Sequence, residues 1–431
     1  MSPVAVREGG RNADCTRKRG TMKHDTETNG PLAGLKVIDC STVLAGPIAG
    51  MVLADFGADV VKIEHPDGDA LRKMGHAKNG HGVWWKVTNR NKRTIVLDLH
   101  DPAGKEAFLA LVKDADVLIE NFRTGTLEKW GLGWDVVSRL NPRLVMLRVT
   151  GFGQTGPYRF RPGYGTVAEA FSGFAHITGE ADGPPTLPPF GLADGIAAYH
   201  GVFAIMFAIY ERDVQGSGKG QYIDLALYEP LFSCLGAQVS TYDQLGIIQN
   251  RRGNRSDNNV PRNAYKTKDG RWVALSTASP SIARRVMNLV GGEGTADDPR
   301  YATNTERVKR ADEVDKMVAD WIGARTLSEV LDAFEKVEAA IGPIYDAAQI
   351  LEDPQYRARE SVTTVADPDL GPLRMQNVFP RMSRTPGRIR FPGARIGQHQ
   401  DEVIGELERA GKISAETAAR LRAAKGAGRR T

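Results

Sequence analysis

Residues 35–64 read LKVIDCSTVLAGPIAGMVLADFGADVVKIE, and this stretch decides the fold class. The run LKVID at 35–39 is short, apolar and rich in β-branched residues, and ADVVKIE at 58–64 has the same character. Between them, GPIAGMVLADFG at 46–57 has the composition of a helix, with Pro47 near its first turn, where proline is well tolerated. The order strand, helix, strand predicts a βαβ unit.

More strands follow in the same alternation. The segments that read as buried strands are RTIVLDL (93–99), ADVLIEN (115–121) and RLVMLRVTGFG (143–153), and YIDLALYEP (222–230) reads as a further strand. LHDPAGKEAFLALVKD, at 99–114, is an amphipathic helix between two of them. The pattern predicts an α/β fold, with a Rossmann-like parallel sheet in a large domain and a second, smaller α+β domain.

The domain boundaries follow from changes in composition. A chain of 431 residues is longer than one hydrophobic core usually supports. Its character changes near Phe232 and turns polar and basic at RRGNRSDNNVPRN, 251–263. We expect a large domain at 31–230 and 340–431 and a small domain at 231–339. Residues 1–30 mix both charge signs and are expected to be a disordered extension, with translation starting at Met1 or Met22.

Composition excludes several classes of function. The apolar fraction of 41% and the charged fraction of 25% are typical of soluble globular proteins. The net charge is only +5 and the basic residues are scattered, so nucleic-acid binding is not expected. The most apolar helical stretch, 197–210, is shorter than the ~20 residues of a membrane span, and we expect a buried core helix there. The three cysteines form no CxxC pair or metal-site spacing, which fits a reducing cytoplasm.

The glycine fingerprint of dinucleotide-binding domains is missing. Such a domain would carry GxGxxG between the first strand and the first helix, but residues 40–50 read CSTVLAGPIAG. Glu64 stands where an acid that binds ribose would be, yet without the glycines it gives little support to a nicotinamide enzyme.

A series of ordered blocks carries a family resemblance. These are LAGPIAGMVLADFGADVVKIEHPDGDALR, NRNKRTIVLDL, ENFRTGTLEKWGLG, RVTGFGQTGPY and ARIGQHQDEVIGEL. Together they resemble class III coenzyme A transferases, also called the CaiB/BaiF or formyl-CoA transferase family, from about Leu32 to the C-terminus. Because many blocks occur in order, the resemblance is more specific than any single motif.

The resemblance implies a fold, a reaction and an assembly. It implies ring-shaped subunits threaded through each other as an interlocked homodimer. The substrates would be an acyl-CoA and a carboxylic acid, with no metal and no tightly bound cofactor. An enzyme carboxylate would attack the thioester to give a mixed anhydride and then an enzyme-bound CoA thioester, from which the acceptor acid takes CoA.

The resemblance also assigns contacts with CoA, residue by residue. The positions that match the family's CoA-binding blocks are His65, Arg72, Leu97, Asn121, Phe122, Arg123 and Lys129. The cations among them suit phosphate groups. Each has a plainer interpretation, because an exposed cation is often only a solvated surface charge and a leucine in a strand is often only core.

The nucleophile is where this chain departs from the family. In RPGYGTVAEAFSGF, 161–174, Gly165 stands where the resemblance places the nucleophilic aspartate, and glycine has no side chain. Leu44 likewise replaces a glutamine that some members carry near the nucleophile. Glu169, four residues after Gly165 and on the same helical face, is our candidate catalytic carboxylate. A second candidate is Asp194 in GLADG, although an acid that opens a helix is often an N-cap.

Two other functions stay open at this point. The chain could have lost the covalent chemistry and bind a CoA ester as a silent subunit that partners a homologous active chain. It could also be an acyl-CoA racemase or isomerase of the same family, which would need an acid and a base on either side of the α-carbon. The sequence does not pair two such residues.

Overall fold

A computed structural model describes residues 30–256 and 258–424. Its centre is a six-stranded, all-parallel sheet in the order β5-β2-β1-β6-β7-β8. These strands span β1 Lys36–Asp39, β2 Asp59–Glu64, β5 Arg93–Val96, β6 Val117–Glu120, β7 Val145–Thr150 and β8 Tyr222–Ala226. The strands predicted from the apolar runs are confirmed, and the order is that of the doubly wound nucleotide-binding fold.

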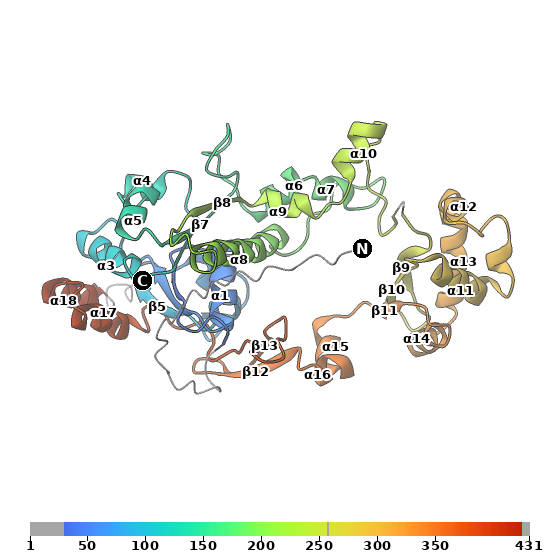
Figure 1. The fold of residues 1–431 in the computed structure, drawn as a ribbon. Helices are drawn as coiled ribbons and strands as arrows, with labels where there is room; N and C mark the ends of the chain where they lie inside the picture. Colours follow the sequence, from blue (N-terminus) through green and yellow to red (C-terminus); the bar gives the residue numbers. More distant parts are fainter. Residues whose placement is uncertain (1–29, 257, 425–431) are drawn as a thin grey trace, which may run out of the picture.

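Helices cover both faces of the sheet (Figure 1). The core on one face includes Ile38, Leu118 and Phe108 and lies under α3 (Pro102–Val112), α5 (Trp134–Leu140), α17 (Gln400–Arg409) and α18 (Ala415–Ala424). The core on the other face includes Val37 and Ile119 and lies under α1 (Ala45–Asp55), α6 (Gly165–Phe171), α8 (Leu192–Asp213) and α9 (Tyr228–Ser233). Alternate residues of the four central strands, β2, β1, β6 and β7, therefore serve different cores, which explains their unbroken apolar runs.

A second core lies apart from the first. It is built on a three-stranded antiparallel sheet in the order β11-β10-β9 and includes Val273, Val318 and Phe334. Its elements are β9 Arg262–Lys266, β10 Trp272–Ser276, α11 Pro280–Gly291, η2 Thr295–Asp297, α12 Asn304–Lys309, α13 Ala311–Gly323, α14 Leu327–Lys336 and β11 Ile341–Pro343. The domain boundaries given above stay a prediction.

Two connections join the two cores (Figure 1). One leaves after β8 through α9 and α10 (Gln238–Leu245), and the other returns through α15 (Ala347–Glu352), α16 (Pro354–Ala358) and the hairpin β12 (Val362–Asp367) and β13 (Gly371–Gln376). The short helix α7 (Phe174–Ile177) lies between α6 and α8 in the chain. The remaining short elements are η1 Ala70–Lys73, β3 Ala77–Lys78, β4 His81–Gly82, α2 Val83–Thr88 and α4 Thr126–Lys129. The predicted disordered extension, residues 1–30, and the two candidate start sites, Met1 and Met22, lie outside the described residues. Gly30 alone of this extension is described.

The apolar helix expected to be buried is only half buried. Within α8, Ala197, Gly201 and Ile205 pack against the sheet. The opposite face carries exposed aromatic side chains, among them Phe207, which is 66% exposed. By length and composition alone this helix could cross a membrane, but the same test is passed by core helices. The small residues on one face of α8 allow close packing against the sheet. The sequence pattern does not show that the opposite face, which carries the aromatic side chains, is exposed.

Candidate active site

A pocket lies at the point where the strand order reverses. It encloses about 630 Å³. Its walls come from the segments that follow β1 (Thr42–Ala45), β6 (Asn121–Thr124) and β7 (Gly151), together with the start of α6 and the first turn of α8. In open α/β sheets, ligands bind at this crevice beyond the carboxyl ends of the strands. The topology therefore places a ligand site here independently of any motif.

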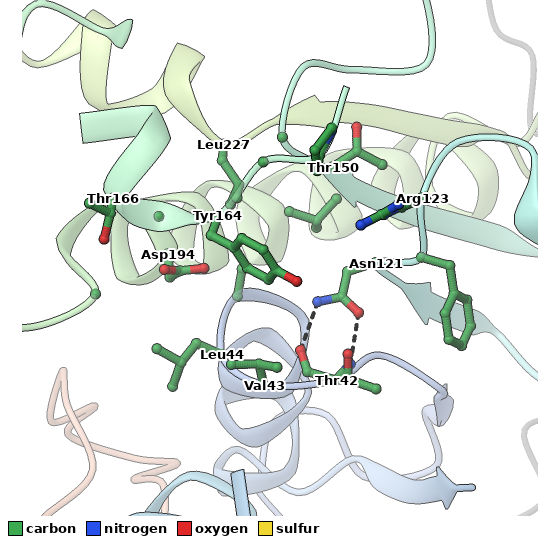
Figure 2. Close-up of a pocket in the computed structure, with 18 of the residues that line it drawn as sticks. Thr42, Val43, Leu44, Asn121, Arg123, Thr150, Tyr164, Thr166, Asp194 and Leu227 are labelled. Carbon is green, nitrogen blue, oxygen red and sulfur yellow. Dashed lines mark hydrogen bonds between the residues drawn. The ribbon is translucent and has the colours of Figure 1, made fainter. Parts of the chain in front are cut away.

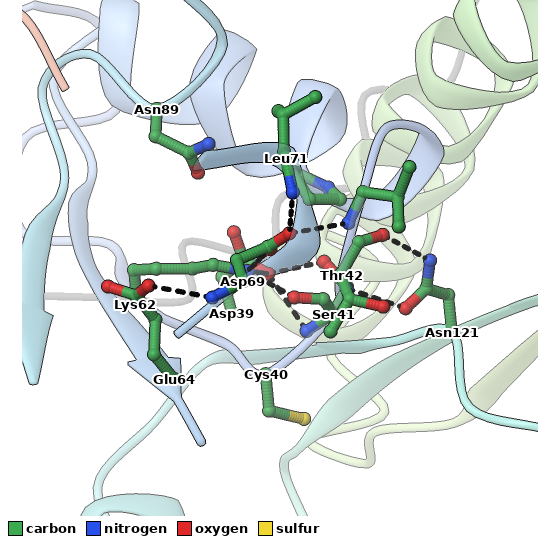
Figure 3. A network of polar contacts seen from close by, with 12 residues as sticks. Asp39, Cys40, Ser41, Thr42, Lys62, Glu64, Asp69, Leu71, Asn89 and Asn121 are labelled. Carbon is green, nitrogen blue, oxygen red and sulfur yellow. Dashed lines mark hydrogen bonds and ion pairs between the residues drawn. The ribbon is translucent and has the colours of Figure 1, made fainter. Parts of the chain in front are cut away.

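The segment that follows β1 is held by side chains from neighbouring elements (Figures 2 and 3). Asn121 accepts a hydrogen bond from the backbone N–H of Thr42 and donates one to its carbonyl, each at 2.7 Å. The Asp69 carboxylate accepts from the N–H of Val43 at 3.2 Å. Val43 adopts a φ of 66°, which is unfavourable for a β-branched residue and persists only where the surroundings impose it. The pocket wall is therefore fixed rather than adaptable.

A buried charge network lies beneath this segment (Figure 3). Lys62 lies 3.5 Å from both Asp39 and Asp69, and its ammonium group donates to the carbonyl of Ser41. Lys92 donates to Asp39 at 2.8 Å. Burial opposes ionisation of Asp39, but Lys62 and Lys92 outweigh it and lower the pKa of Asp39 to about 2. Burial lowers the pKa of Lys92 to about 8.

Asp194 carries a carboxylate that lines the pocket (Figure 2). It is the third residue of α8, whose N-cap is Gly191, so Asp194 does not occupy the N-cap position. Burial raises the pKa of Asp194 to about 6, and the negative charge of Glu169 adds to the effect. A partly desolvated carboxylate that opens into a pocket is suited to nucleophilic attack.

Glu169 points elsewhere. Its side chain is 1% exposed and is not among those that line the pocket. Its Oε1 accepts the backbone N–H groups of Leu192 at 3.1 Å and Ala193 at 3.3 Å. This engagement with the start of α8 leaves Asp194 as the carboxylate with access to a ligand, so the geometry favours the second candidate of the sequence analysis over the first.

Gly165 gives Asp194 its space. A Cβ atom built at Gly165 would lie 2.0 Å from Oδ2 of Asp194 and 3.0 Å from its carboxyl carbon, far inside contact distance. Because Gly165 has no side chain, the carboxylate of Asp194, which belongs to the neighbouring helix α8, can occupy this position. The two residues lie together although 29 positions separate them in the sequence.

We expect Gly165→Ala to lower kcat by about ten- to a hundredfold, because the added methyl group would rotate the Asp194 carboxylate away from its position. The fold should survive, since the clash is with the end of a side chain. Gly195→Ala is the matched control: it lies next to Asp194, and its Cβ would meet nothing within 4 Å. Steady-state kinetics and circular dichroism of both variants test this, and equal kcat values would contradict it.

The residues predicted to contact CoA divide into two groups. Asn121, Phe122 and Arg123 line the pocket. The other four lie outside its lining: His65 and Lys129 are exposed, Leu97 is 2% exposed within the core, and Arg72 binds both oxygens of Glu64 and stacks over Trp85. Their contacts with CoA stay predictions.

Sequence reasoning missed other pocket residues, notably Thr42, Val43 and Thr150. Thr150 is the last residue of β7, and Thr42 and Val43 belong to the loop that follows the carboxyl end of β1 at Asp39. The sequence indicates such positions, because the alternation of strands and helices predicts where the carboxyl ends of the strands meet. Among residues 30–256 and 258–424, no group of three or more His, Cys, Asp or Glu side chains could hold a metal ion.

Comparisons with known proteins agree with this architecture. The profile of CoA-transferase family III matches residues 32–400. Succinyl-CoA–D-citramalate CoA-transferase of Chloroflexus aurantiacus is 40% identical over 379 residues, which cover 88% of this chain and 94% of the relative. The beta subunit of succinyl-CoA–L-malate CoA-transferase from the same organism is 42% identical over 387 residues, covering 89% and 95%. A crystal structure of a CAIB/BAIF family protein from Brucella suis aligns with a TM-score of 0.77 at 31% identity, covering 89% of this chain and 100% of that one.

Proposed function

Because this chain belongs to CoA-transferase family III, we propose that Asp194 is the nucleophile with which it moves CoA between an acyl-CoA and a carboxylic acid. The family and the CoA-transferase relatives confirm the resemblance found in the sequence and establish CoA transfer as the reaction. They do not favour a silent binding subunit or a racemase. The observation that carries the proposal is the Asp194 carboxylate, which opens into the pocket at the reversal of strand order.

The proposed chemistry uses this carboxylate twice. A carboxylate oxygen of Asp194 attacks the thioester carbonyl, a C–O bond forms, the C–S bond breaks, and the CoA thiolate leaves a mixed anhydride. The thiolate then attacks the carboxyl carbon of Asp194 and releases the donor acid, which leaves CoA bound to Asp194 as a thioester. The acceptor carboxylate repeats the two steps in reverse order, and Asp194 is regenerated.

The pocket walls suit the charges that this reaction creates. The N-terminus of α1 begins at Ala45, and its N-cap residue, Leu44, provides no side-chain hydrogen bond. Helix N-termini attract anions, so α1 can stabilise the oxyanion or the thiolate. Asn121, Phe122 and Arg123 lie at the mouth formed after β6, and we assign them to the CoA side of the pocket, with His65 and Lys129 toward its phosphates.

We propose that the acyl groups are those of dicarboxylic acids. The relatives compared above are named for succinyl-CoA. In this chain three arginines line the pocket, Arg123, Arg159 and Arg161. Arg123 makes no ion pair with any residue in the described part of the chain, so it is available to an anion. A second carboxylate on the donor or the acceptor would find a cation here.

Incubation with succinyl-CoA and a panel of acids tests the proposed function. Succinyl-CoA, acetyl-CoA and benzoyl-CoA would each be mixed with D-citramalate, L-malate or glutarate, and the CoA esters formed would be separated by chromatography. Exchange with dicarboxylic partners at least about tenfold faster than with acetyl-CoA is expected. Failure to exchange CoA with any acid, together with no calorimetric heat on adding CoA, would overturn the function.

We expect kcat/KM to fall as pH drops through about 6, the pKa of Asp194. The reactive form is the carboxylate, so protonation below this pH removes the nucleophile, and the rate should decrease about tenfold per pH unit. Above about pH 7 the curve should be flat with respect to this group. A pH profile measured between 4.5 and 8 checks this, and a plateau that persists to pH 5 would contradict it.

We also propose the interlocked homodimer of ring-shaped subunits. The aromatic face of α8, formed by Tyr199, Phe203, Phe207 and Tyr210, is exposed, and a contiguous exposed apolar surface often marks a protein–protein interface. The two separate connections between the cores support a ring-shaped subunit. Since one relative is a beta subunit, a homologous second chain is an alternative partner. Sedimentation of the pure protein distinguishes a dimer from a monomer.

The free cysteines Cys40 and Cys234 support a cytoplasmic location.

A further inference from the structure

A second carboxylate lies buried beside the proposed nucleophile. Glu169 belongs to α6, and its Oε1 receives two backbone N–H groups from the start of α8. These donors belong to Leu192 and Ala193, the two residues that directly precede Asp194. The turn that carries the nucleophile is therefore tied to α6 by one side chain.

The N-cap residue of this helix does not provide the cap itself. The N-cap position of α8 is Gly191, which supplies no side-chain hydrogen bond. Glu169 thus does from a neighbouring helix what a serine or aspartate at the N-cap normally does from the same one. Because α6 also contributes Gly165, which leaves room for the carboxylate, one short helix sets both the backbone and the side-chain space of Asp194.

The charged surroundings of Asp194 single out Glu169. Burial and Glu169 together raise the pKa of Asp194. The other ionisable groups on elements packed against α8 are Asp55 on α1, Arg148 on β7, Tyr222 and Asp224 on β8, and Tyr228 and Glu229 on α9. On α8 itself the ionisable side chains are Tyr199, His200, Tyr210, Glu211, Arg212 and Asp213, and across the pocket they are Tyr164, Arg123, Arg159 and Arg161.

Most of these groups are engaged elsewhere. Asp55 pairs with Arg90, and Arg148 pairs with Glu120 and Glu128. Asp224 accepts the N–H of Gln154. No cation is among the groups that act on the pKa of Asp194.

We propose that Glu169 is a positioning residue for Asp194, holding the first turn of α8 in place and keeping a negative charge beside the nucleophile. The inference rests on the proposed function, because it assumes that Asp194 is the attacking carboxylate. The negative charge of Glu169 makes the carboxylate of Asp194 more basic. That carboxylate is still ionised at neutral pH, and this combination favours attack on a thioester.

Three variants separate the hydrogen bonds that Glu169 accepts from the effect of its negative charge. Glu169→Gln keeps an oxygen that can accept from Leu192 and Ala193 but removes the charge. Glu169→Met removes both. Glu229→Gln removes an exposed carboxylate from α9, another helix that packs against α8, and serves as the control. For each variant, kcat and KM would be measured between pH 4.5 and 8 with succinyl-CoA, with folding checked by circular dichroism.

In Glu169→Gln we expect the acid limb of kcat/KM to move down by about half a pH unit or more, with the plateau within about tenfold of wild type. Glu169→Met should show the same shift and a further fall in kcat at similar KM. Glu229→Gln should match wild type. An unchanged acid limb in Glu169→Gln, with exchange otherwise intact, would overturn this inference alone. If wild type itself exchanges no CoA, the proposed function fails instead. Loss of all activity in Glu169→Gln, with covalent label at 169 in wild type, would overturn both and make Glu169 the nucleophile.

Discussion

Asp194→Asn should lower kcat for CoA exchange by at least about a thousandfold, because an amide cannot attack the thioester and no other carboxylate lines the pocket in the described part of the chain. The binding of CoA should change little, since Asp194 lies on the opposite side of the pocket from Asn121 and Arg123 (Figure 2). Calorimetry with CoA and steady-state kinetics measure the two effects separately.

A covalent trap shows which residue is attacked. Wild type incubated with succinyl-CoA and hydroxylamine, or with borohydride, should be modified at Asp194, and mass spectrometry of the peptide that contains GLADG would locate the change. Asp135→Asn is the matched control: Asp135 is also an acid in the first turn of a helix, but it is exposed on α5 and outside the pocket. Full activity of Asp194→Asn, or modification at another carboxylate, would refute the assignment.

The sheet could be predicted because its signal is local. Strands such as Val145–Thr150 are buried on both faces, and burial on both faces requires an unbroken apolar run that is visible in the sequence. The exposed aromatic face of α8 could not be predicted in the same way. Its residues have the same apolar character as core residues, and only the three-dimensional arrangement decides which face meets the sheet.

The candidate site was predictable in part for the same reason. Asn121, Phe122 and Arg123 follow directly from a strand end, so a linear motif carries them into the pocket. The relation between Gly165, Glu169 and Asp194 is a contact between two helices, and neither spacing nor residue type reveals it. Gly165 in isolation looked like the loss of a nucleophile. In the structure it leaves the space in which the Asp194 carboxylate lies.

Lys62→Met should lower the free energy of unfolding by about 3–5 kcal/mol. Lys62 and Asp39 are both fully buried, and Asp69 is nearly so. Burial lowers the pKa of Lys62, but the attraction of Asp39 and Asp69 outweighs it, so the net pKa is raised and the ammonium group is charged. Removal of this cation leaves two buried carboxylates with Lys92 as the remaining counter-charge. Urea unfolding followed by circular dichroism measures the loss.

A surface ion pair and a double variant show whether charge or packing causes the loss of stability in Lys62→Met. Lys309 pairs with Glu306 at 2.7 Å but is 62% exposed, so Lys309→Met should cost less than about 1 kcal/mol. Asp69→Asn keeps the oxygen that accepts from Val43 and Leu71 and alters Oδ2, which has no hydrogen-bond partner among the described residues. If excess negative charge is the cause, Lys62→Met should cost clearly less in the Asp69→Asn background than in wild type. Equal costs in the two backgrounds would mean that the lysine acts by packing and through its bond to Ser41, and that its charge contributes little to the stability of the pocket wall.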